Sequence, residues 1–292
     1  MDLQDLTQVF GMKKITVVRR RWHSFLSGVC AAERGVMLQL LLQGIGVVWL
    51  LAAPVWGKQP YHTDFASFDP SFWHLDTDCS HCGSRGGDEC TQFTNASASF
   101  GSGTANGTGV VLHTQHLATG PTHCGASCTS THLTFSPKVL YGNFTTVARW
   151  FGEGTSAAAR ATATGFIGLD SPGNEASITI GFHGSGWDGD ADFGRKFQTA
   201  LYKDVSKPHH REYVTAPGGR RIDSQANEFT VEWRPDVVRW WLNGVVVRAV
   251  TDKAQIPAVA MQLRLHSRSG YCNRLSGDDS FQASVLSFEY KP

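Results

Sequence analysis

The sequence predicts an all-β sandwich, because short alternating segments separated by turn residues recur along it, whereas long helical periodicity is missing. In residues 174–180, N-E-A-S-I-T-I, apolar and polar residues alternate, as in a strand with one buried and one exposed face. Asn243-Gly244 stands between two apolar runs, and both residues tolerate the positive φ of a tight hairpin. The 31 glycines suit many turns between short strands. Together these features favour two packed sheets.

The N-terminal part has a different composition from the rest of the chain. Residues 1–34 form a basic segment with six Lys/Arg and three Asp/Glu, and an apolar run follows from Val36 to Ala53. A basic segment before an apolar run of about 18 residues is typical of a secretory signal peptide or a signal-anchor helix. We assign residues 35–57 to either, with a possible cleavage site at Val55-Trp56-Gly57, and residues 58–292 to the sandwich.

These alternatives predict the location of the protein. A cleaved signal would give an extracellular or cell-wall protein, and an uncleaved one a type II membrane protein of the secretory pathway. The membrane is expected to be a partner only through this segment. The rest of the chain holds 20 basic (26 − 6) and 22 acidic (25 − 3) residues, a balance that argues against nucleic acid as a partner.

Cysteine usage agrees with an oxidising compartment. Six cysteines follow the apolar run, an even number that predicts disulfides with 15 possible pairings. Cys79-x-x-Cys82 with His81 would suit zinc, but a secretory context favours disulfides. No other metal-ligand spacing stands out, so neither a metal nor a cofactor is expected. The disulfide candidates are Cys79, Cys82, Cys90, Cys124, Cys128 and Cys272, and the Asn-x-Ser/Thr glycosylation acceptors are Asn95, Asn106 and Asn143.

The expected elements follow in chain order. Residues 61–78 predict an entry strand and a loop, and residues 79–109, rich in Gly, Ser, Thr and Asn, predict loops held by disulfides. Short strands are expected at 110–112 and 133–135. Alternating runs predict further strands at 174–184, 261–265 and 284–290, and apolar runs at 238–242 and 245–248 flank the Asn243-Gly244 turn. Residues 170–173, Asp-Ser-Pro-Gly, predict a turn.

Several segments, in chain order, resemble glycoside hydrolase family 16. Residues 141–149 resemble its Y-G-x-F-x-x-x-x-K/R strand, and 164–169 resemble the strand that precedes its catalytic strand. Residues 197–202 resemble its V-Q-T-N-x-F/Y strand, and 228–236 its H-T-Y-x-I-x-W-x-P-D segment. Residues 238–248 resemble I-x-W-Y-V-D-G-x-x-V-R. The resemblance covers roughly residues 133–290, and 61–132 only loosely. It implies a concanavalin-A-like jelly roll that binds polysaccharide of the β-glucan type in a cleft on its concave sheet.

The catalytic motif of that family, E-x-D-x-E, is incomplete in this sequence. By resemblance Glu175 occupies the nucleophile position, whereas Ser177 replaces the aspartate and Thr179 the acid/base. Retaining glycosidases need two carboxyl groups about 5–5.5 Å apart, and a threonine hydroxyl does not give up a proton near neutral pH. The resemblance implies a glycosyl hydrolase or transglycosylase, but the motif predicts weak activity or none.

Another carboxylate would be needed to restore catalysis. Asp170 falls on the predicted turn, and Glu228 and Glu232 match a different family strand, so we exclude them. Asp188, Asp190 and Asp192 lie in the segment W-D-G-D-A-D-F, which begins at Trp187. This segment lacks the glutamate of a calcium loop. We interpret these aspartates as a solvated acidic loop at the rim of the cleft and as the best substitute acid.

Three side chains are candidates for sugar binding. Trp187 lies in a Gly-rich loop, and His183 follows the motif strand. Trp240 and Trp241 must point to opposite faces of their strand, so one belongs to the core and Trp241 is our candidate.

Three hypotheses follow. The protein binds polysaccharide with a degenerate site, it is an active retaining enzyme that uses Glu175 and a displaced acid, or it is a structural surface protein.

Overall fold

The computed structural model describes residues 37–41, 47–51, 59–80, 91–101, 108–117, 128–150, 163–171, 176–183, 194–203, 210–223, 225–269 and 280–292. The chain divides into two units, Met1–Pro54 and Val55–Pro292. In the first, β1 (Met37–Leu41) pairs antiparallel with β2 (Val47–Leu51). Strands thus occupy part of the segment for which a signal or anchor helix was predicted, and its targeting role stays a prediction. No helix among the described residues is long and apolar enough to cross a membrane.

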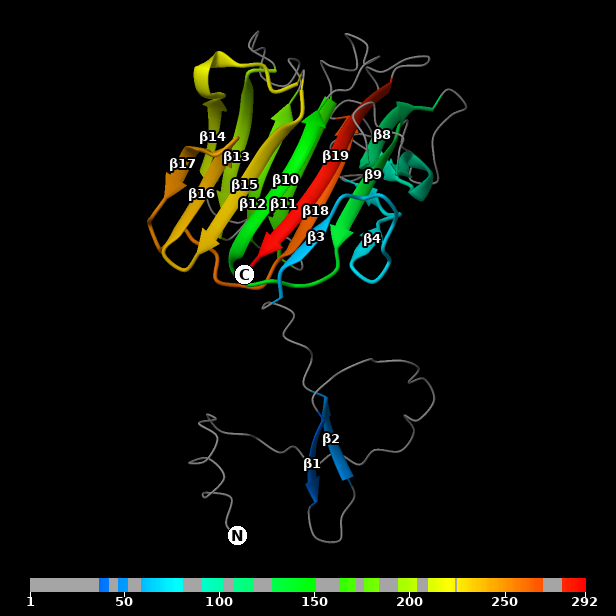
Figure 1. The fold of residues 1–292 in the computed structure, drawn as a ribbon, viewed down its shortest axis with the longest axis vertical. Helices are drawn as coiled ribbons and strands as arrows, with labels where there is room; N and C mark the ends of the chain where they lie inside the picture. Colours follow the sequence, from blue (N-terminus) through cyan, green and yellow to red (C-terminus); the bar gives the residue numbers. More distant parts are fainter. Residues whose placement is uncertain are drawn as a thin grey trace. The chain divides into compact units, whose positions relative to one another are not determined.

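The second unit is a jelly-roll sandwich of two stacked antiparallel sheets (Figure 1). Sheet I follows the order β17-β16-β15-β10-β19, and β19 continues to β3 and β8. Its strands are β3 (Tyr61–Thr63), β7 (Ala98–Phe100), β8 (Val110–His116), β10 (Gly142–Trp150), β15 (Asn227–Arg234), β16 (Val237–Leu242), β17 (Val245–Val250) and β19 (Ser280–Lys291).

Sheet II follows the order β14-β13-β12-β11-β18-β9-β4. Its strands are β4 (Trp73–Leu75), β9 (Cys128–Phe135), β11 (Ala163–Asp170), β12 (Ser177–His183), β13 (Lys196–Tyr202), β14 (His210–Thr215) and β18 (Gln262–Ser269).

Strand β9 belongs to both sheets and joins them, because its Cys128 and Thr129 pair with β8 of sheet I. Its first residues, Cys128–Ser130, pair in parallel with β6 (Thr91–Phe93), which also pairs with β5 (Cys79–Ser80). Its later residues pair with β18 and β4. The region expected to be loops, 79–109, therefore contains β5, β6, β7 and the 3₁₀ turn η3 (Asn95–Ser97).

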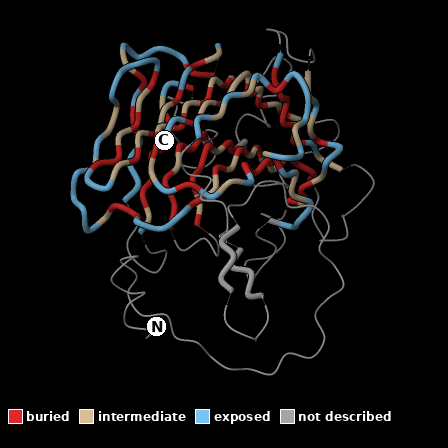
Figure 2. The backbone as a smooth tube through the Cα atoms, turned by 60° about the horizontal axis from the view of Figure 1, so that its bottom comes forward, coloured by how far each residue is buried: buried red, intermediate tan, exposed pale blue. Residues whose placement is uncertain are grey.

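The core lies between the sheets, where buried residues alternate along the strands (Figure 2). Trp150, Trp233 and Trp240 are among its largest fully buried side chains. Trp150 requires a glycine opposite, because a Cβ on Gly165 would stand 2.2 Å from two of its ring carbons. Close packing of this kind fixes which strands face each other across the sandwich.

The structure confirms the predicted fold class. The hairpin at Asn243-Gly244 joins β16 to β17, with φ values of 49° and 75°. The prediction for residue 170 was wrong in one respect: Asp170 is not in a turn. It is the last residue of β11, because its neighbours Ser177 and Gln262 continue the ladder on both sides.

Candidate functional site

Strand β12 carries the incomplete motif on the outer face of sheet II. Ile178 and Ile180 are buried in the core at 0% and 1% exposure, so the alternate residues Ser177, Thr179 and His183 face outward. The predicted polar row is therefore present for the residues that the structure describes. Glu175, the expected nucleophile, lies outside the described residues.

A row of side chains crosses this outer face at right angles to the strands. Residues from six adjacent strands pair one after another in a single register, and alternation places them on the same face. Ring contacts connect several of them with two further rings, since Phe166 lies 5.4 Å from His183 and 4.6 Å from His266, and His132 lies 4.9 Å from Phe93. The register runs Tyr213, Gln198, Gly181, Phe166, His266, His132.

We call this set, with His183 and Phe93, the aromatic row. Tyr213 is 47% exposed at the β14 edge, and its hydroxyl accepts a hydrogen bond from Gln198 Nε2 at 3.1 Å. At the other end, His132 Nδ1 lies 3.0 Å from Asp76 Oδ2, to which Thr134 Oγ1 donates at 2.9 Å. The row thus combines aromatic rings with hydrogen-bonding groups, and Tyr213 is its exposed end, whereas Gln198 and Phe93 are buried at 5% exposure each. Among the described residues no group of histidines, cysteines and acids has the arrangement of a metal site.

The next row of paired residues across these strands has small side chains at its centre. Ala200, Thr179 and Gly168 pair directly across β13, β12 and β11, and Arg264 follows on β18. A Cβ placed on Gly168 would meet Thr179 Cγ2 at 3.2 Å and Asp170 Oδ2 at 3.5 Å. The Asp170 carboxyl and the Thr179 side chain therefore flank the same glycine on the same face.

Asp170 is a carboxyl on this face that the sequence analysis excluded as a candidate. Its carboxyl hydrogen-bonds the Ser177 side chain, and its Oδ2 lies 3.7 Å from Arg264 Nη1. Burial raises the pKa of Asp170 above its usual value, while the Ser177 hydrogen bond and the Arg264 charge oppose that rise. The alternation of Phe166, Gly168 and Asp170 along one strand was the signal that would have placed it on this face.

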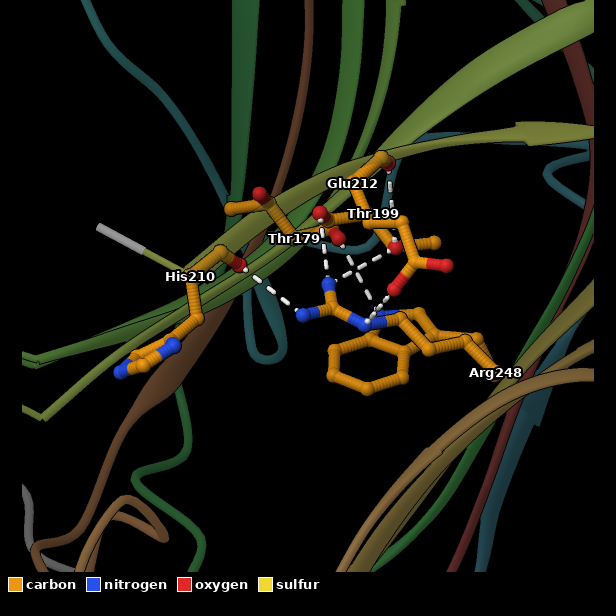
Figure 3. A network of polar contacts seen from close by, with 6 residues as sticks. Thr179, Thr199, His210, Glu212 and Arg248 are labelled. Carbon is orange, nitrogen blue, oxygen red and sulfur yellow. Dashed lines mark hydrogen bonds and ion pairs between the residues drawn. The ribbon is translucent and has the colours of Figure 1, made fainter.

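Trp240 and Arg248, from sheet I, reach the backbone behind the motif. Trp240 Nε1 donates to the Thr179 carbonyl oxygen at 3.2 Å. Arg248 Nη1 donates to the Thr199 carbonyl oxygen at 2.8 Å and to its hydroxyl at 2.9 Å, and its guanidinium lies 4.9 Å from the Trp240 ring. Figure 3 shows this network, which ties β16 and β17 to β12 and β13.

The remaining predicted sugar-binding residues do not join the aromatic row. Trp240 is the core member of the tryptophan pair, as alternation required, at 0% exposure. Trp241 is half-buried on the outer face of sheet I, opposite Thr230, which removes it from the candidate site. Trp187 and the aspartates at 188, 190 and 192 lie outside the described residues.

Two of the expected disulfide cysteines and two of the glycosylation acceptors lie in described segments. Cys79 and Cys128 are each disulfide-bonded. Asn95 is exposed, whereas Asn143 Oδ1 accepts a hydrogen bond from Arg234 Nη2 at 3.2 Å. The others lie outside the described residues: Cys82, Cys90, Cys124, Cys272 and Asn106.

Comparison with known proteins gives a family and a set of similar folds. The model of glycosyl hydrolases family 16 matches residues 92–272. A β-glucanase from Bacillus licheniformis superposes with a TM-score of 0.61 at 15% identity, covering 81% of this chain and 99% of the enzyme. No curated protein sequence matches the chain.

Two further solved structures have similar folds. The catalytic domain of an endo-1,3-β-glucanase (laminarinase) from Thermotoga petrophila has a TM-score of 0.60 at 15% identity, covering 79% of this chain and 95% of its own. A Bacteroides ovatus family 16 protein for mixed-linkage glucan, in complex with a G4G4G3G product, has a TM-score of 0.60 at 11% identity, with coverages of 79% and 99%. At these identities the superpositions establish the fold alone.

Proposed function

Since this chain belongs to glycosyl hydrolase family 16, we propose that it binds or acts on a β-glucan-type polysaccharide on the outer face of sheet II. The similar folds include a laminarinase and a mixed-linkage glucan protein with bound product. The motif strand β12 belongs to sheet II, and its Ser177 and Thr179 point outward on this face.

The observation that carries the proposal is the single register of the aromatic row. Aromatic side chains combine an apolar ring face with polar edges or neighbours, which suits sugar rings that have apolar C–H faces and equatorial hydroxyls. Six strands at about 4.8 Å spacing place its ends about 24 Å apart. A row of that length accommodates several linked sugars rather than a single one.

The motif limits what the family chemistry can do at Thr179. General acid catalysis contributes typically about 10²–10⁴-fold, and a threonine at the acid/base position forgoes that contribution. The protein is therefore a polysaccharide-binding member of the family in which the motif itself supports little turnover.

A second candidate is an active retaining hydrolase or transglycosylase with Glu175 as the nucleophile and a displaced acid. The position of Asp170 beside Ser177, with its carboxyl over Gly168, favours this candidate. It requires that Asp170 lose and regain a proton during the reaction.

The proposed site of action is outside the cell or at its surface. The basic residues 1–34, the apolar run that follows and the disulfide-bonded Cys79 and Cys128 support passage through the secretory pathway. We propose that residues 35–57 direct the sandwich into that pathway, as a cleaved signal or as an anchor.

Isothermal titration of the full chain with oligosaccharides of laminarin, mixed-linkage glucan, xyloglucan and chitin tests the proposed function. We expect micromolar to millimolar binding to at least one β-glucan, with affinity that rises with chain length until the aromatic row is filled. An absence of heat with every glycan would contradict the proposal.

A further inference from the structure

We propose that Asp170 is the proton donor for glycosidic bond cleavage on the outer face of sheet II, in place of the carboxyl that the motif lacks at Thr179. The proposal rests on the proposed function, because it assumes a glycan bound on this face. It assigns the displaced acid to a strand next to the motif strand.

The geometry brings the Asp170 carboxyl to the Thr179 position. Asp170 pairs directly with Ser177, two residues before Thr179 on the same outward face. The place where a Gly168 Cβ would stand is 3.5 Å from Asp170 Oδ2 and 3.2 Å from Thr179 Cγ2. Because Gly168 has no side chain, nothing on β11 separates the carboxyl from the threonine.

The surroundings of Asp170 suit a group that exchanges a proton. Its side chain keeps 20% of its exposure, so an oxygen of a bound glycan can reach it. Burial favours the neutral acid by raising its pKa, whereas the Ser177 hydrogen bond and the Arg264 guanidinium stabilise the carboxylate. A proton donor must be stable both as the neutral acid and as the carboxylate, and these opposing contacts each stabilise one of the two states. The other polar residues near Asp170 are Arg264 and Gln262 on β18, and Tyr202 on β13, which pairs with Ser177.

The reaction balances with water as the second reactant. As the bond between the anomeric carbon and the glycosidic oxygen breaks, its electron pair goes to the oxygen, which takes the proton of Asp170. The leaving sugar departs as an alcohol. A water molecule bonds to the anomeric carbon, and the proton that this water loses returns to the Asp170 carboxylate, so that the cleavage consumes one water and restores the acid.

Two other described carboxyl groups, Glu232 and Asp76, do not fit the role. Glu232 lies on the outer face of sheet I, where both of its oxygens accept hydrogen bonds from Arg239 Nη1 at 3.0 Å. Asp76 belongs to the far end of the aromatic row, where His132 and Thr134 hold it. Only Asp170, among these three, lies in the register next to Thr179.

Two substrates separate a proton donor from a merely structural carboxyl. A β-glucan has a sugar leaving group that needs protonation, whereas a 2,4-dinitrophenyl β-oligoglucoside has a leaving group that departs without it. We expect Asp170→Asn in the full chain to lower kcat/KM for β-glucan by about 10²–10⁴-fold, and for the dinitrophenyl glycoside by less than about tenfold. Glu232→Gln, the matched carboxyl-to-amide change on sheet I, should alter neither.

The pH profile of the unmodified protein gives a test that needs no variant. Its kcat/KM for β-glucan should fall as the pH rises through the raised pKa of Asp170, and its kcat/KM for the dinitrophenyl glycoside should lack that fall. Equal losses on both substrates in Asp170→Asn, or full glucan activity in that variant, would overturn the proposal. Binding of glucan without any hydrolysis by the unmodified protein would overturn it while leaving the proposed function standing, whereas absence of glucan binding would overturn both.

Discussion

Arg248→Met tests whether the guanidinium that reaches from β17 to β13 helps to hold the two sheets together. The side chain is 10% exposed and donates to both the carbonyl and the hydroxyl of Thr199, which is fully buried. Methionine keeps the apolar stem and removes every donor. Hydrogen bonds to charged groups contribute about 1.5–3 kcal/mol each, and an acceptor left unpaired in the interior costs about 1–3 kcal/mol.

The expected loss of unfolding free energy is therefore about 2–4 kcal/mol. The ion pair with Glu212 adds little, because the Glu212 side chain is 58% exposed and such pairs contribute about 0–1 kcal/mol. For a domain of this size each kcal/mol lowers Tm by about 2–4 °C.

Urea denaturation of the full chain, followed by tryptophan fluorescence, measures the effect. Glu212→Gln is the matched control, since it removes the ion pair and leaves the bonds to Thr199 in place. Arg248→Met within about 0.5 kcal/mol of the unmodified protein, the range of ordinary surface substitutions, would refute the reasoning. So would a Glu212→Gln variant as unstable as Arg248→Met, because the ion pair would then be the main contribution.

Further predictions concern the core and the buried carboxyl. Gly165→Ala should destabilise the fold by about 1–3 kcal/mol, because its Cβ would overlap the Trp150 ring; thermal unfolding checks it, and an unchanged Tm would contradict it. Trp240→Phe should cost about 1–3 kcal/mol by leaving the Thr179 carbonyl without its indole donor, measured by urea denaturation. The pKa of Asp170 is raised in the folded state, so the folded protein binds more protons than the unfolded chain between the ordinary and the raised pKa, and stability falls as pH rises through that window. Asp170→Asn should remove this loss, so the Tm of the variant minus the Tm of the unmodified protein should be more positive at pH 7 than at pH 4; an equal difference at the two pH values would contradict it.

Local features of the site were predictable from the sequence. Period-two alternation placed Ser177 and Thr179 on one face, and it made one of Trp240 and Trp241 a core residue. The Asn243-Gly244 turn was predictable from the φ values that those residues tolerate. These features depend on neighbours along the chain, which a single sequence shows directly.

The assembly of the site depends on pairings that the sequence does not show. His132 and His266 lie opposite each other because β9 pairs with β18, and nothing local identifies that partner or its register. Asp170 was assigned to a turn because Asp-Ser-Pro-Gly has turn chemistry, yet pairing on both sides keeps it in β11. Trp241 was assigned to the sugar site because the face of its sheet was unknown.

Glycan titration of a matched pair of variants tests the central claim, that the outer face of sheet II holds the polysaccharide. Phe166→Ala removes the ring in the middle of the aromatic row, and Trp241→Ala removes a half-buried ring from the outer face of sheet I. We predict that Phe166→Ala weakens β-glucan binding at least about tenfold, equivalent to about 1.4 kcal/mol, while Trp241→Ala leaves it unchanged. Unchanged binding in Phe166→Ala together with a loss in Trp241→Ala would contradict the account and place the glycan on the opposite sheet.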